Sequence, residues 1–419
     1  MIANRRRCLA TAAVAVFTLT ACSGGADDAV PSTIEQTTTT VRPPVVTDRR
    51  LTIGLMVPSS DSLIAEPVQD AVELAVEQIN DAGGVLDTRV RLVVADEGSS
   101  SASAGIAVQT LLDSGVDAII GPASSPNALS TLDEIVDAGT LACSPTASAM
   151  ALDGFPDDDL FFRTIPSDSL QARAIAQAAD QTGAQRAAIV YVDDAYGRPF
   201  AAAIDTTLQS GSINVIDSIP FTSTDDSLSD EARRVNDSDA QVVIVLAGSD
   251  DGTRFLEALN EEGADELATI IVNDALRNPS TPQRIAGLDD DFRTKIVGLA
   301  PQAESADPEM PFDPPGPFAS NAFDCVNLIA LSAVRADSDD PMVMADQMAF
   351  VSASGSSCSS FARCVETFRD GFQIDYNGPS GLTELSARTG DTARATFDRF
   401  FFNQSGEDEL QRTVVVAAG

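Results

Sequence analysis

The chain has 419 residues, a formal net charge of −37 and no histidine. Its length exceeds that of a typical single domain and 44% of its residues are apolar, so two globular lobes with a large core are expected. The acidity disfavours nucleic acid and anionic lipid as surface partners, because both are themselves negative. The lack of histidine excludes Ser-His-Asp and Cys-His catalysis and His-ligated zinc, and no nucleotide-binding glycine motif or EF-hand loop occurs.

The N-terminus has the features of an export signal. Arg5-Arg6-Arg7 precede an apolar run, Leu9–Ala21, that is too short to cross a bilayer as a stable helix. The run ends in Leu19-Thr20-Ala21-Cys22, which resembles a bacterial lipobox, the site where the signal is cleaved before a lipidated cysteine. We therefore expect residues 1–21 to be a signal peptide and Cys22 to carry lipid. The arginines also resemble a twin-arginine signal, so the export route stays open.

Residues 22–49 have the composition of a disordered tether. They are rich in Ser, Gly, Thr and Pro and lack apolar periodicity. As a flexible coil this segment would span roughly 30 Å, which suits a folded domain held beside a membrane. The expected location is the outer face of the bacterial cytoplasmic membrane, with the lipid anchor as the sole membrane contact.

From Leu51 onward, apolar strands alternate with amphipathic helices. Leu51–Val57 and Val90–Ala95 are predicted strands, and Val68–Ile79 and Ala104–Leu112 are predicted helices. A succession of this kind predicts a doubly wound parallel sheet covered by helices on both faces.

The stretch Asp117–Ala149 contains two consecutive strands that each end in a loop of small hydroxyl residues. Ser124 and Ser125 follow the first strand, and Ser144–Ser148 follow the second. The carboxyl ends of parallel strands meet at one sheet edge, where ligands bind, and helix N-termini there offer N–H groups to a small anion. Two ordinary loops are the plainer interpretation, but their occurrence in consecutive units with an acidic partner downstream favours a binding edge.

A second alternating series follows the extended segment Phe161–Pro166 and predicts a second lobe. Ser167 can cap its first helix, and the acidic runs Asp193-Asp194 and Asp289–Asp291 are interpreted as solvated. The predicted strands are Arg186–Val192, Asn214–Ile219, Gln241–Leu246 and Thr269–Val272, and the predicted helices are Leu170–Ala179, Phe200–Leu208 and Thr253–Asn260.

The C-terminal third is predicted to return to the first lobe and close the second. Its predicted elements are a strand leaving the second lobe (Lys295–Ala300), a Pro-rich loop (Met310–Pro317), helices (Ala319–Ala336 and Pro341–Phe350), a turn-rich connection (Phe372–Gly381) and closing strands (Arg394–Phe402 and Thr413–Ala417).

Four cysteines follow the predicted lipidation site. Cys358 and Cys364 lie six residues apart in a Ser-rich segment of an exported chain, where disulfides persist, so we expect them to pair. Two separate thiols are the alternative. Cys143 on a core strand and Cys325 on a helix are expected to be buried thiols.

Together these segments resemble the leucine/isoleucine/valine-binding family of type I periplasmic-binding proteins, the solute receptors of branched-chain amino acid ABC transporters. The resemblance runs from about Leu51 to the C-terminus. It rests on the ordered motifs LTIGLMVP, AVELAVEQINDAGGV, VRLVVADEG, VDAIIGPASS, ACSPTAS, FFRTIPSD, AAIVYVDDAYGRPFA, FDCVNLIAL and IDYNGPSG.

The resemblance implies an α/β fold of two Rossmann-like doubly wound lobes joined by three crossover strands, with the ligand in the cleft between them. The crossovers would lie near Arg163–Pro166, Ile296–Pro301 and Gly381–Thr389. The first lobe would then contain residues 50–164 and 300–384, and the second would contain residues 165–299 and 385–419.

The resemblance also implies ligand contacts. Ser125, with Ser124 beside it, takes the place of the family's carboxylate-binding serine, and Thr146, Ala147 and Ser148 take the places of its second loop. Tyr196 and Asp274 take the places of the residues that face the α-ammonium, although a loop aromatic and a solvated acid are the plainer interpretations. Gly248-Ser249 stand where the family often has an aromatic residue, which leaves the side-chain pocket and the exact ligand open.

The resulting hypothesis is a solute-binding lipoprotein, not an enzyme, that captures an amino acid and delivers it to the permease of an ABC importer. No cofactor or metal is predicted. One alternative keeps the fold but makes the chain a sensor, or an amide- or urea-type receptor, for a membrane partner. Another alternative is a hydrolase using acidic residues, which is disfavoured because no paired carboxylates stand out in a loop at a strand end.

Overall fold

The computed structural model describes residues 47–264, 267–302 and 316–418. The predicted signal peptide, Cys22, most of the predicted tether and most of the predicted Pro-rich loop lie outside these ranges.

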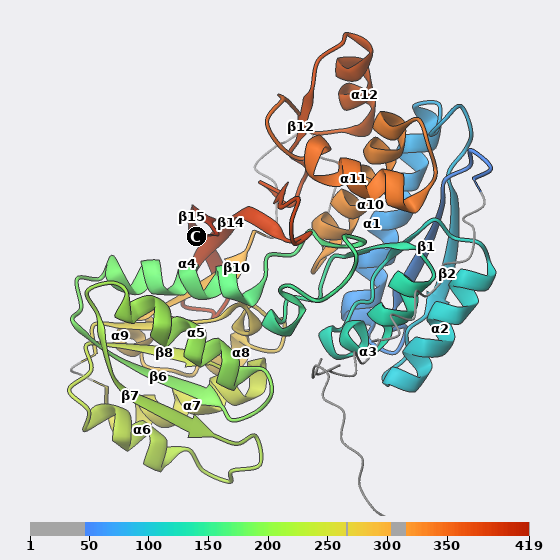
Figure 1. Cartoon of the computed structure of the whole chain (residues 1–419). Helices are drawn as coiled ribbons and strands as arrows, with labels where there is room; N and C mark the ends of the chain where they lie inside the picture. Colours follow the sequence, from blue (N-terminus) through green and yellow to red (C-terminus); the bar gives the residue numbers. More distant parts are fainter. Residues whose placement is uncertain (1–46, 265–266, 303–315, 419) are drawn as a thin grey trace, which may run out of the picture. The chain divides into compact units, whose positions relative to one another are not determined.

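Five parallel strands form the sheet of the first lobe, in the order β2-β1-β3-β4-β5. Strands β1 and β2 are labelled in Figure 1. Strands β1, β3, β4 and β5 are buried between α1 and α10 on one face and α2 and α3 on the other, whereas the edge strand β2 is partly exposed. The elements are β1 (Thr52–Val57), α1 (Ser62–Asp81), β2 (Arg91–Asp96), α2 (Ser101–Asp113), β3 (Ala118–Ile120), α3 (Ser125–Asp137), β4 (Leu141–Ser144), β5 (Phe161–Arg163) and α10 (Ala319–Ala336).

Further short elements complete this lobe. Helices α11 (Pro341–Val351) and α12 (Phe361–Arg369) and a two-stranded parallel sheet of β11 (Ser356–Cys358) and β12 (Ile374–Tyr376) share the core of α1 and α10. A 3₁₀ turn, η1 (Met150–Leu152), follows the loop after β4.

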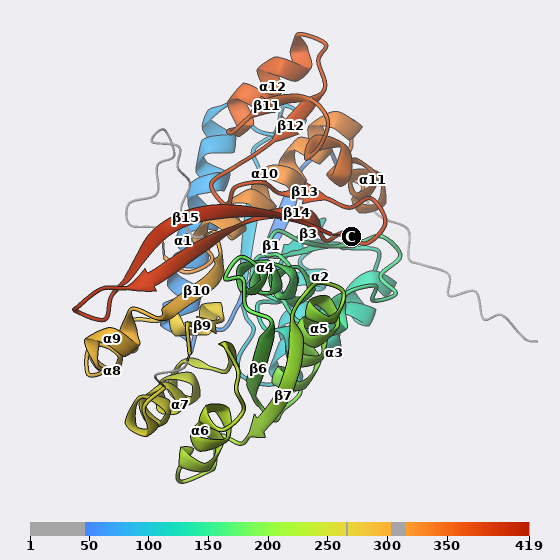
Figure 2. The ribbon, with the colours of Figure 1, turned by 90° about the vertical axis from the view of Figure 1, so that its left-hand side faces the viewer.

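The second sheet has the order β13-β14-β10-β9-β8-β6-β7, and β15 also pairs with β14. Strands β6 to β10 are parallel, whereas β14 runs antiparallel to β10 and forms a long ribbon with β15 (Figure 2). Helices α4 and α5 cover one face, and α6 and α7 cover the other.

The bounds in the second lobe are α4 (Asp168–Asp180), β6 (Arg186–Val192), α5 (Gly197–Gln209), β7 (Asn214–Phe221), α6 (Ser229–Asn236), β8 (Val242–Leu246), α7 (Ser249–Glu262), β9 (Thr269–Val272), η2 (Asp274–Leu276), α8 (Pro282–Ile285), α9 (Asp290–Arg293), β10 (Ile296–Pro301), β13 (Glu384–Leu385), β14 (Thr392–Phe402) and β15 (Asp408–Ala417).

The segments that link the two sheets are hydrogen-bonded to one another. The Arg163 N–H donates to the Gly390 carbonyl (3.1 Å), and the Gln302 N–H donates to the Thr396 carbonyl (3.0 Å). Gly390 has φ +65°, and a Cβ there would lie 1.9 Å from the Phe161 carbonyl oxygen, so only glycine allows this approach. The first connection, at Arg163, and the third connection, at Gly390, are therefore in direct backbone contact.

The predicted fold class, two doubly wound α/β lobes of the type I periplasmic-binding-protein kind, is confirmed. Some elements were predicted wrongly. The segment Lys295–Ala300 does not simply leave the second lobe, because β10 lies inside its sheet between β9 and β14. Strands β11 and β12 were interpreted as loop, since β11 is Ser-rich and both strands are only three residues long, too short for a periodic pattern to stand out. The boundaries 50–164 with 300–384 and 165–299 with 385–419 remain our proposal for the lobes.

Both disulfides of the structure lie in the first lobe. Cys358 pairs with Cys364, as expected, with a Cα–Cα distance of 5.4 Å. Cys143 and Cys325 are fully buried, as expected, but the prediction of free thiols is wrong: they form a disulfide with a Cα–Cα distance of 5.8 Å. Strand β4 packs against α10, which places two cysteines 182 residues apart within bonding range.

Loss of the Cys143–Cys325 bridge should cost more stability than loss of the Cys358–Cys364 bridge, because it closes a far longer loop. Chain entropy gives typically about 2–5 kcal/mol for long loops and about 2 kcal/mol for a short one. We expect Cys143→Ala/Cys325→Ala to lower the denaturant midpoint more than Cys358→Ala/Cys364→Ala. Peptide mapping without reduction should recover both pairs, and alkylation of Cys143 in unreduced, unfolded protein would refute the long-range bridge.

Asp324 of α10 is a fully buried carboxyl group with three hydrogen-bond donors. It accepts from the Tyr376 hydroxyl (2.7 Å), the Ser380 N–H (2.9 Å) and the Ser380 hydroxyl. Burial raises its pKa to about 7, against the lowering effect of these donors. These hydrogen bonds attach the segment from Tyr376 to Ser380 to helix α10.

The buried Asp324 should make the protein less stable as pH rises from about 4 to 7. In this window the folded chain keeps the Asp324 proton and the unfolded chain releases it, so stability falls with pH, by up to about 4 kcal/mol from this group. Denaturant titrations at several pH values should show a shallower decline for Asp324→Asn, which keeps polar partners but no titration. The exposed control Asp291→Asn should retain the full decline, and an unchanged slope in Asp324→Asn would disprove the assignment.

Candidate functional site

Ser144, the last residue of β4, fixes the turn of the loop that follows this strand. The Ser144 hydroxyl donates to the Pro122 carbonyl (2.7 Å) and accepts from the Ala147 N–H (3.0 Å). This turn brings Thr146, Ala147 and Ser148 beside the start of α3. We call residues 144–149 the binding loop.

The start of α3 contacts the binding loop directly. Ser124 is the N-cap of α3 and accepts from the Asn127 N–H (3.3 Å), while the Ser125 hydroxyl accepts from the Ala149 N–H (3.2 Å). The Thr146 hydroxyl donates to the Ala123 carbonyl (2.5 Å). The structure therefore brings the predicted residues of both hydroxyl loops together.

Glu97, at the end of β2, was missed in the sequence and changes the interpretation of this edge. Its fully buried carboxylate accepts from the Ala123 N–H (2.7 Å), the Ser124 N–H (3.1 Å) and the Asn127 side-chain amide (2.7 Å). The expectation that α3 offers a set of free N–H groups to an anion is therefore only partly met. Glu97 takes the Ala123 and Ser124 N–H groups, so the N–H and hydroxyl of Ser125 are the donors at the start of α3 that we assign to an anion.

Arg163, the last residue of β5, is hydrogen-bonded to the backbone of the binding loop. Its fully buried guanidinium donates to the carbonyls of Ala147 (3.3 Å) and Ala149 (3.1 Å). It also pairs with Asp153 (2.5 Å) and Asp391 (2.6 Å). Sequence reasoning missed this role, and the signal that could have revealed it is a charged residue inside the largely apolar segment Phe161–Ile165.

Tyr196 stands at the carboxyl end of β6, at the start of α5. Asp194 accepts from the Tyr196 and Gly197 N–H groups (2.9 and 2.7 Å), so one member of the predicted solvated acid run shapes this turn. A Cβ on Gly197 would lie 2.0 Å from the Val192 carbonyl oxygen, which explains the Tyr-Gly pair. The Tyr196 hydroxyl accepts from the Asn273 amide (3.2 Å).

Asp274 follows β9 and begins η2. Its carboxyl group accepts from the Gln171 amide (2.9 Å), which also donates to the Leu299 carbonyl (2.9 Å). Burial raises the pKa of Asp274, against the lowering effect of these donors. The charges of Asp274 and Asp168, after burial, raise the pKa of Tyr196, so the three groups lie close together.

Asp168 is another residue that sequence reasoning missed. It is 3% exposed, begins α4 one turn before Gln171, and its N–H donates to the Ser148 carbonyl (2.9 Å). Its carboxyl group bonds the Ser148 side chain, and burial, followed by the charge of Asp274, raises its pKa to about 8. Asp168 thereby connects Ser148 to Asp274 and Tyr196.

The sequence showed no paired carboxylates in a loop at a strand end, and the structure brings Asp274 near Asp168, the first residue of a helix. Asp168 follows a crossover segment and Asp274 follows a strand 106 positions later in the chain, so only the fold brings them together. Within residues 47–264, 267–302 and 316–418, neither forms an ion pair with an arginine or lysine.

A cavity of about 360 Å³ opens beside Asp274. Its walls include the polar side chains of Arg277, Asn278, Gln302 and Glu407 and the ring of Phe318. Phe318 precedes α10 of the first lobe, so residues of both lobes line this space. The cavity has the volume of a small-ligand pocket.

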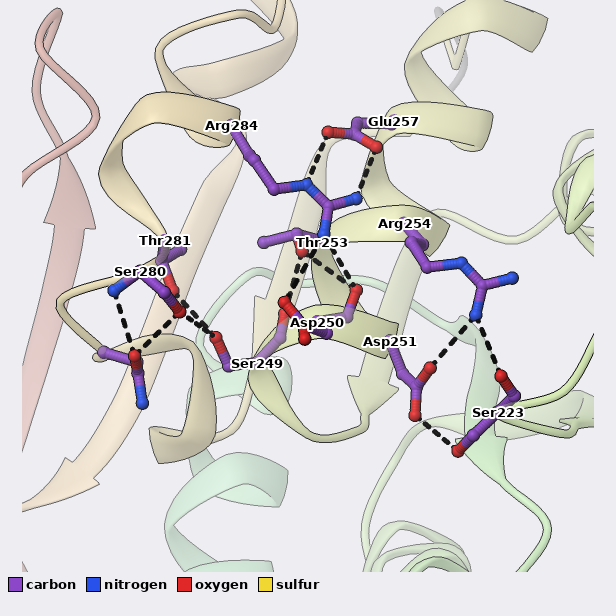
Figure 3. A network of polar contacts seen from close by, with 11 residues as sticks. Ser223, Ser249, Asp250, Asp251, Thr253, Arg254, Glu257, Ser280, Thr281 and Arg284 are labelled. Carbon is purple, nitrogen blue, oxygen red and sulfur yellow. Dashed lines mark hydrogen bonds and ion pairs between the residues drawn. The ribbon is translucent and has the colours of Figure 1, made fainter. Parts of the chain in front are cut away.

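The rim of the second lobe is polar where the resemblance leads one to expect an aromatic residue. Figure 3 shows the Ser249 hydroxyl within 3.2 Å of the hydroxyls of both Ser280 and Thr281. Arg284 forms a two-pronged contact with Glu257 (2.8 and 2.5 Å), and Arg254 pairs with Asp251 (3.2 Å). These contacts fix the start of α7 and leave hydroxyl groups, not an apolar wall, at Gly248-Ser249.

The described part of the chain contains no group of three or more His, Cys, Asp or Glu side chains arranged to hold a metal ion. None of the helices described there is long and apolar enough to span a membrane.

Two lobes joined at hydrogen-bonded connections, with a polar site built from both, define the class of two-lobed solute receptors. The chain belongs to the periplasmic binding protein family, whose model matches residues 51–290. The resemblance inferred from the sequence motifs is thereby confirmed.

Individual relatives agree with this assignment. The chain is 27% identical over 298 residues to the Leu/Ile/Val-binding protein BraC3 of Rhizobium johnstonii, covering 69% of this chain and 80% of the relative. The substrate-binding protein LivJ of Streptococcus pneumoniae, solved with isoleucine, superposes with a TM-score of 0.64 at 20% identity, covering 88% of this chain and 100% of LivJ. A solute-binding protein of R. palustris, solved with 4-hydroxybenzoate, gives a TM-score of 0.67 at 16% identity, covering 88% of this chain and 98% of that protein.

Proposed function

We propose that this chain is an extracytoplasmic receptor that captures an amino acid between its lobes and delivers it to an ABC importer. The observation that carries the proposal is the position of Asp168. It contacts Ser148 of the hydroxyl-rich binding loop and lies near Asp274 and Tyr196. Ser125 and Ser148 can receive a carboxylate, while Asp274, Asp168 and Tyr196 can receive an ammonium. A site with these two poles suits an α-amino acid.

The relatives support the transport role. BraC3 is named a Leu/Ile/Val-binding protein, and LivJ is described as a branched-chain amino acid transporter substrate-binding protein. The R. palustris complex with 4-hydroxybenzoate shows that the fold alone does not specify an amino acid. A receptor for an amide or urea, or a sensor for another membrane partner, is therefore the second candidate, and a permease and ATPase encoded beside the gene would favour transport.

The proposal assigns binding without chemical conversion, despite the paired carboxylates. Asp168 and Asp274 are held by Ser148 and Gln171, respectively, which suits a fixed receptor for a cation. Ligand extracted from the complex and analysed by mass spectrometry should be chemically unchanged.

An amino acid should stabilise the protein, and Asp274→Ala should weaken its binding. A ligand at about 100 times its Kd adds about 2.7 kcal/mol of stability, so a thermal-shift screen of amino acids, amides and aliphatic acids can identify it. Asp274→Ala removes one of the acids proposed to face the ammonium and should cost about 2–5 kcal/mol, or roughly 30-fold or more in Kd. Ser148→Ala should cost about 1–3 kcal/mol.

Calorimetry with the ligand found in the screen measures these losses. Asp193→Ala, which removes a partly exposed acid paired with Arg198 beside the Tyr196 turn, is the matched control and should bind like the parent. A ligand without an amine, or full affinity in Asp274→Ala, would disprove the amino-acid assignment and leave the receptor fold in place.

The proposal includes a lipid anchor at Cys22, which is supported by the Leu19-Thr20-Ala21-Cys22 sequence and the polar segment behind it. We expect Cys22→Ala to shift the protein from the membrane fraction to the soluble exported fraction, because a lipid chain supplies the membrane affinity. Cell fractionation with immunoblotting measures this shift. Equal membrane retention of the variant and the parent would show that the lipobox assignment is wrong.

A further inference from the structure

The Cys143–Cys325 disulfide joins helix α10 to the strand that carries the binding loop. Cys143 directly precedes Ser144, whose hydroxyl fixes the turn of that loop. The Cys143 carbonyl also accepts from the Gly121 N–H (2.8 Å), and Gly121 follows β3 on the way to Ser125. One end of the bridge therefore lies at the base of both hydroxyl-rich loops.

The other end of the bridge belongs to a helix that is held firmly in the core. Every residue of α10 from Ala319 to Ala333 is buried. The carboxyl group of Asp324, the residue before Cys325, accepts three hydrogen bonds. A close-packed helix of this kind has little freedom to move, so a covalent bond to it restrains the residue at the other end of that bond.

Thr164 connects α10 to the binding loop a second time. Its hydroxyl donates to the Asn321 carbonyl (2.8 Å) and lies 3.4 Å from the Cys325 sulfur. The Asn321 amide donates in return to the Thr164 carbonyl (2.9 Å). The Thr164 N–H donates to the Ser144 carbonyl (3.3 Å). Ser144 is thus restrained by a covalent bond at the preceding residue and by a hydrogen bond to its own carbonyl.

Strand β4 is short, which makes this restraint important. It comprises only Leu141–Ser144, so Ser144 is both its last residue and the residue that folds the binding loop. The ends of secondary-structure elements open locally at little cost in free energy. A bond at Cys143 opposes such opening at the position on which the loop depends.

The bridge acts as a constant restraint. Cys143 and Cys325 are both fully buried, so an external thiol cannot reach the sulfur atoms in the folded protein. A switch operated by reduction is therefore not the role that this placement supports.

We propose that the Cys143–Cys325 disulfide is a positioning element of the ligand site, which holds Ser144 against α10 and keeps the binding loop in the arrangement that receives a ligand carboxylate. This inference rests on the proposed function for its ligand and adds a role for a covalent bond in the core. A loop that is ordered in advance loses less conformational freedom on binding. The bridge thereby raises affinity without contacting the ligand.

Two control variants separate this role from a general effect on stability. Cys358→Ala/Cys364→Ala removes the other disulfide of the same lobe, which links β11 to α12. Within the described ranges, neither of these cysteines is hydrogen-bonded to residues 144–149. Ile329→Ala leaves a cavity in the same core, one helical turn after Cys325, and keeps the bridge.

The first measurement is amide hydrogen exchange of the unliganded protein. The reporting N–H groups are those of Ala147, Ala149 and Thr164, which donate to Ser144, Ser125 and Ser144, respectively. We expect these groups to exchange roughly 10-fold or more faster in Cys143→Ala/Cys325→Ala than in either control, because loss of the bridge permits local opening.

The second measurement is calorimetry with L-isoleucine, the amino acid in the LivJ complex. If the loop without its bridge is correctly arranged for about a tenth of the time, the apparent Kd rises about 10-fold. We expect this loss in Cys143→Ala/Cys325→Ala, whereas the controls should stay within about twofold of the parent because their loops keep one arrangement. Cys143→Ala/Cys325→Val, which refills part of the vacated volume, should show the same loss and serves if the alanine pair folds poorly.

The outcomes distinguish this inference from the function on which it rests. Equal exchange of the loop amides in Cys143→Ala/Cys325→Ala and Ile329→Ala would overturn the positioning role and leave the bridge as a source of stability alone. Unchanged isoleucine affinity after loss of the bridge would overturn it as well. Failure of the parent to bind isoleucine would count against the proposed function, and the exchange comparison would then decide the positioning role by itself.

Discussion

The buried guanidinium of Arg163 is the interaction on which the rest of the site depends. It ends β5, holds two carbonyls of the binding loop and pairs with Asp153 beside that loop and Asp391 beside β14. A buried charge is tolerated only when partners replace its hydration. One side chain thus ties the binding loop, the first connection and the third connection together.

This arrangement orders much of the proposed binding edge without a ligand. Ser144 folds the binding loop, Ser125 holds Ala149, and the Asp168 N–H fixes Ser148. Such preorganisation reduces the ordering cost of binding. Because Asp168 begins α4, which packs on the second sheet, the binding loop of the first lobe is already in contact with the second lobe.

Local patterns in the sequence predicted the sheets, most helices and the two hydroxyl-rich loops that the structure brings together. Helix Ala319–Ala336 and strand Thr269–Val272 were predicted to the residue, since apolar periodicity and flanking breakers record local structure. Asp168, Glu97 and the Cys143–Cys325 bridge were missed because their meaning depends on neighbours far away in the chain. In the sequence, Asp168 is an ordinary acidic residue in the first turn of a helix, and only the fold places Asp274 near it.

A raised pKa alone does not mark the functional acid, as Asp324 and Asp168 demonstrate. Burial raises both pKa values, to about 7 and about 8 respectively. Asp324 is surrounded by the Tyr376 and Ser380 donors and has no second carboxyl group among the causes of its shift, so its proton completes a structural network. Asp168 instead shares its surroundings with Asp274, which borders an open cavity. The difference lies in the surroundings of each carboxyl group: hydrogen-bond donors enclose Asp324, whereas Asp274, beside Asp168, borders a cavity with room for a small ligand.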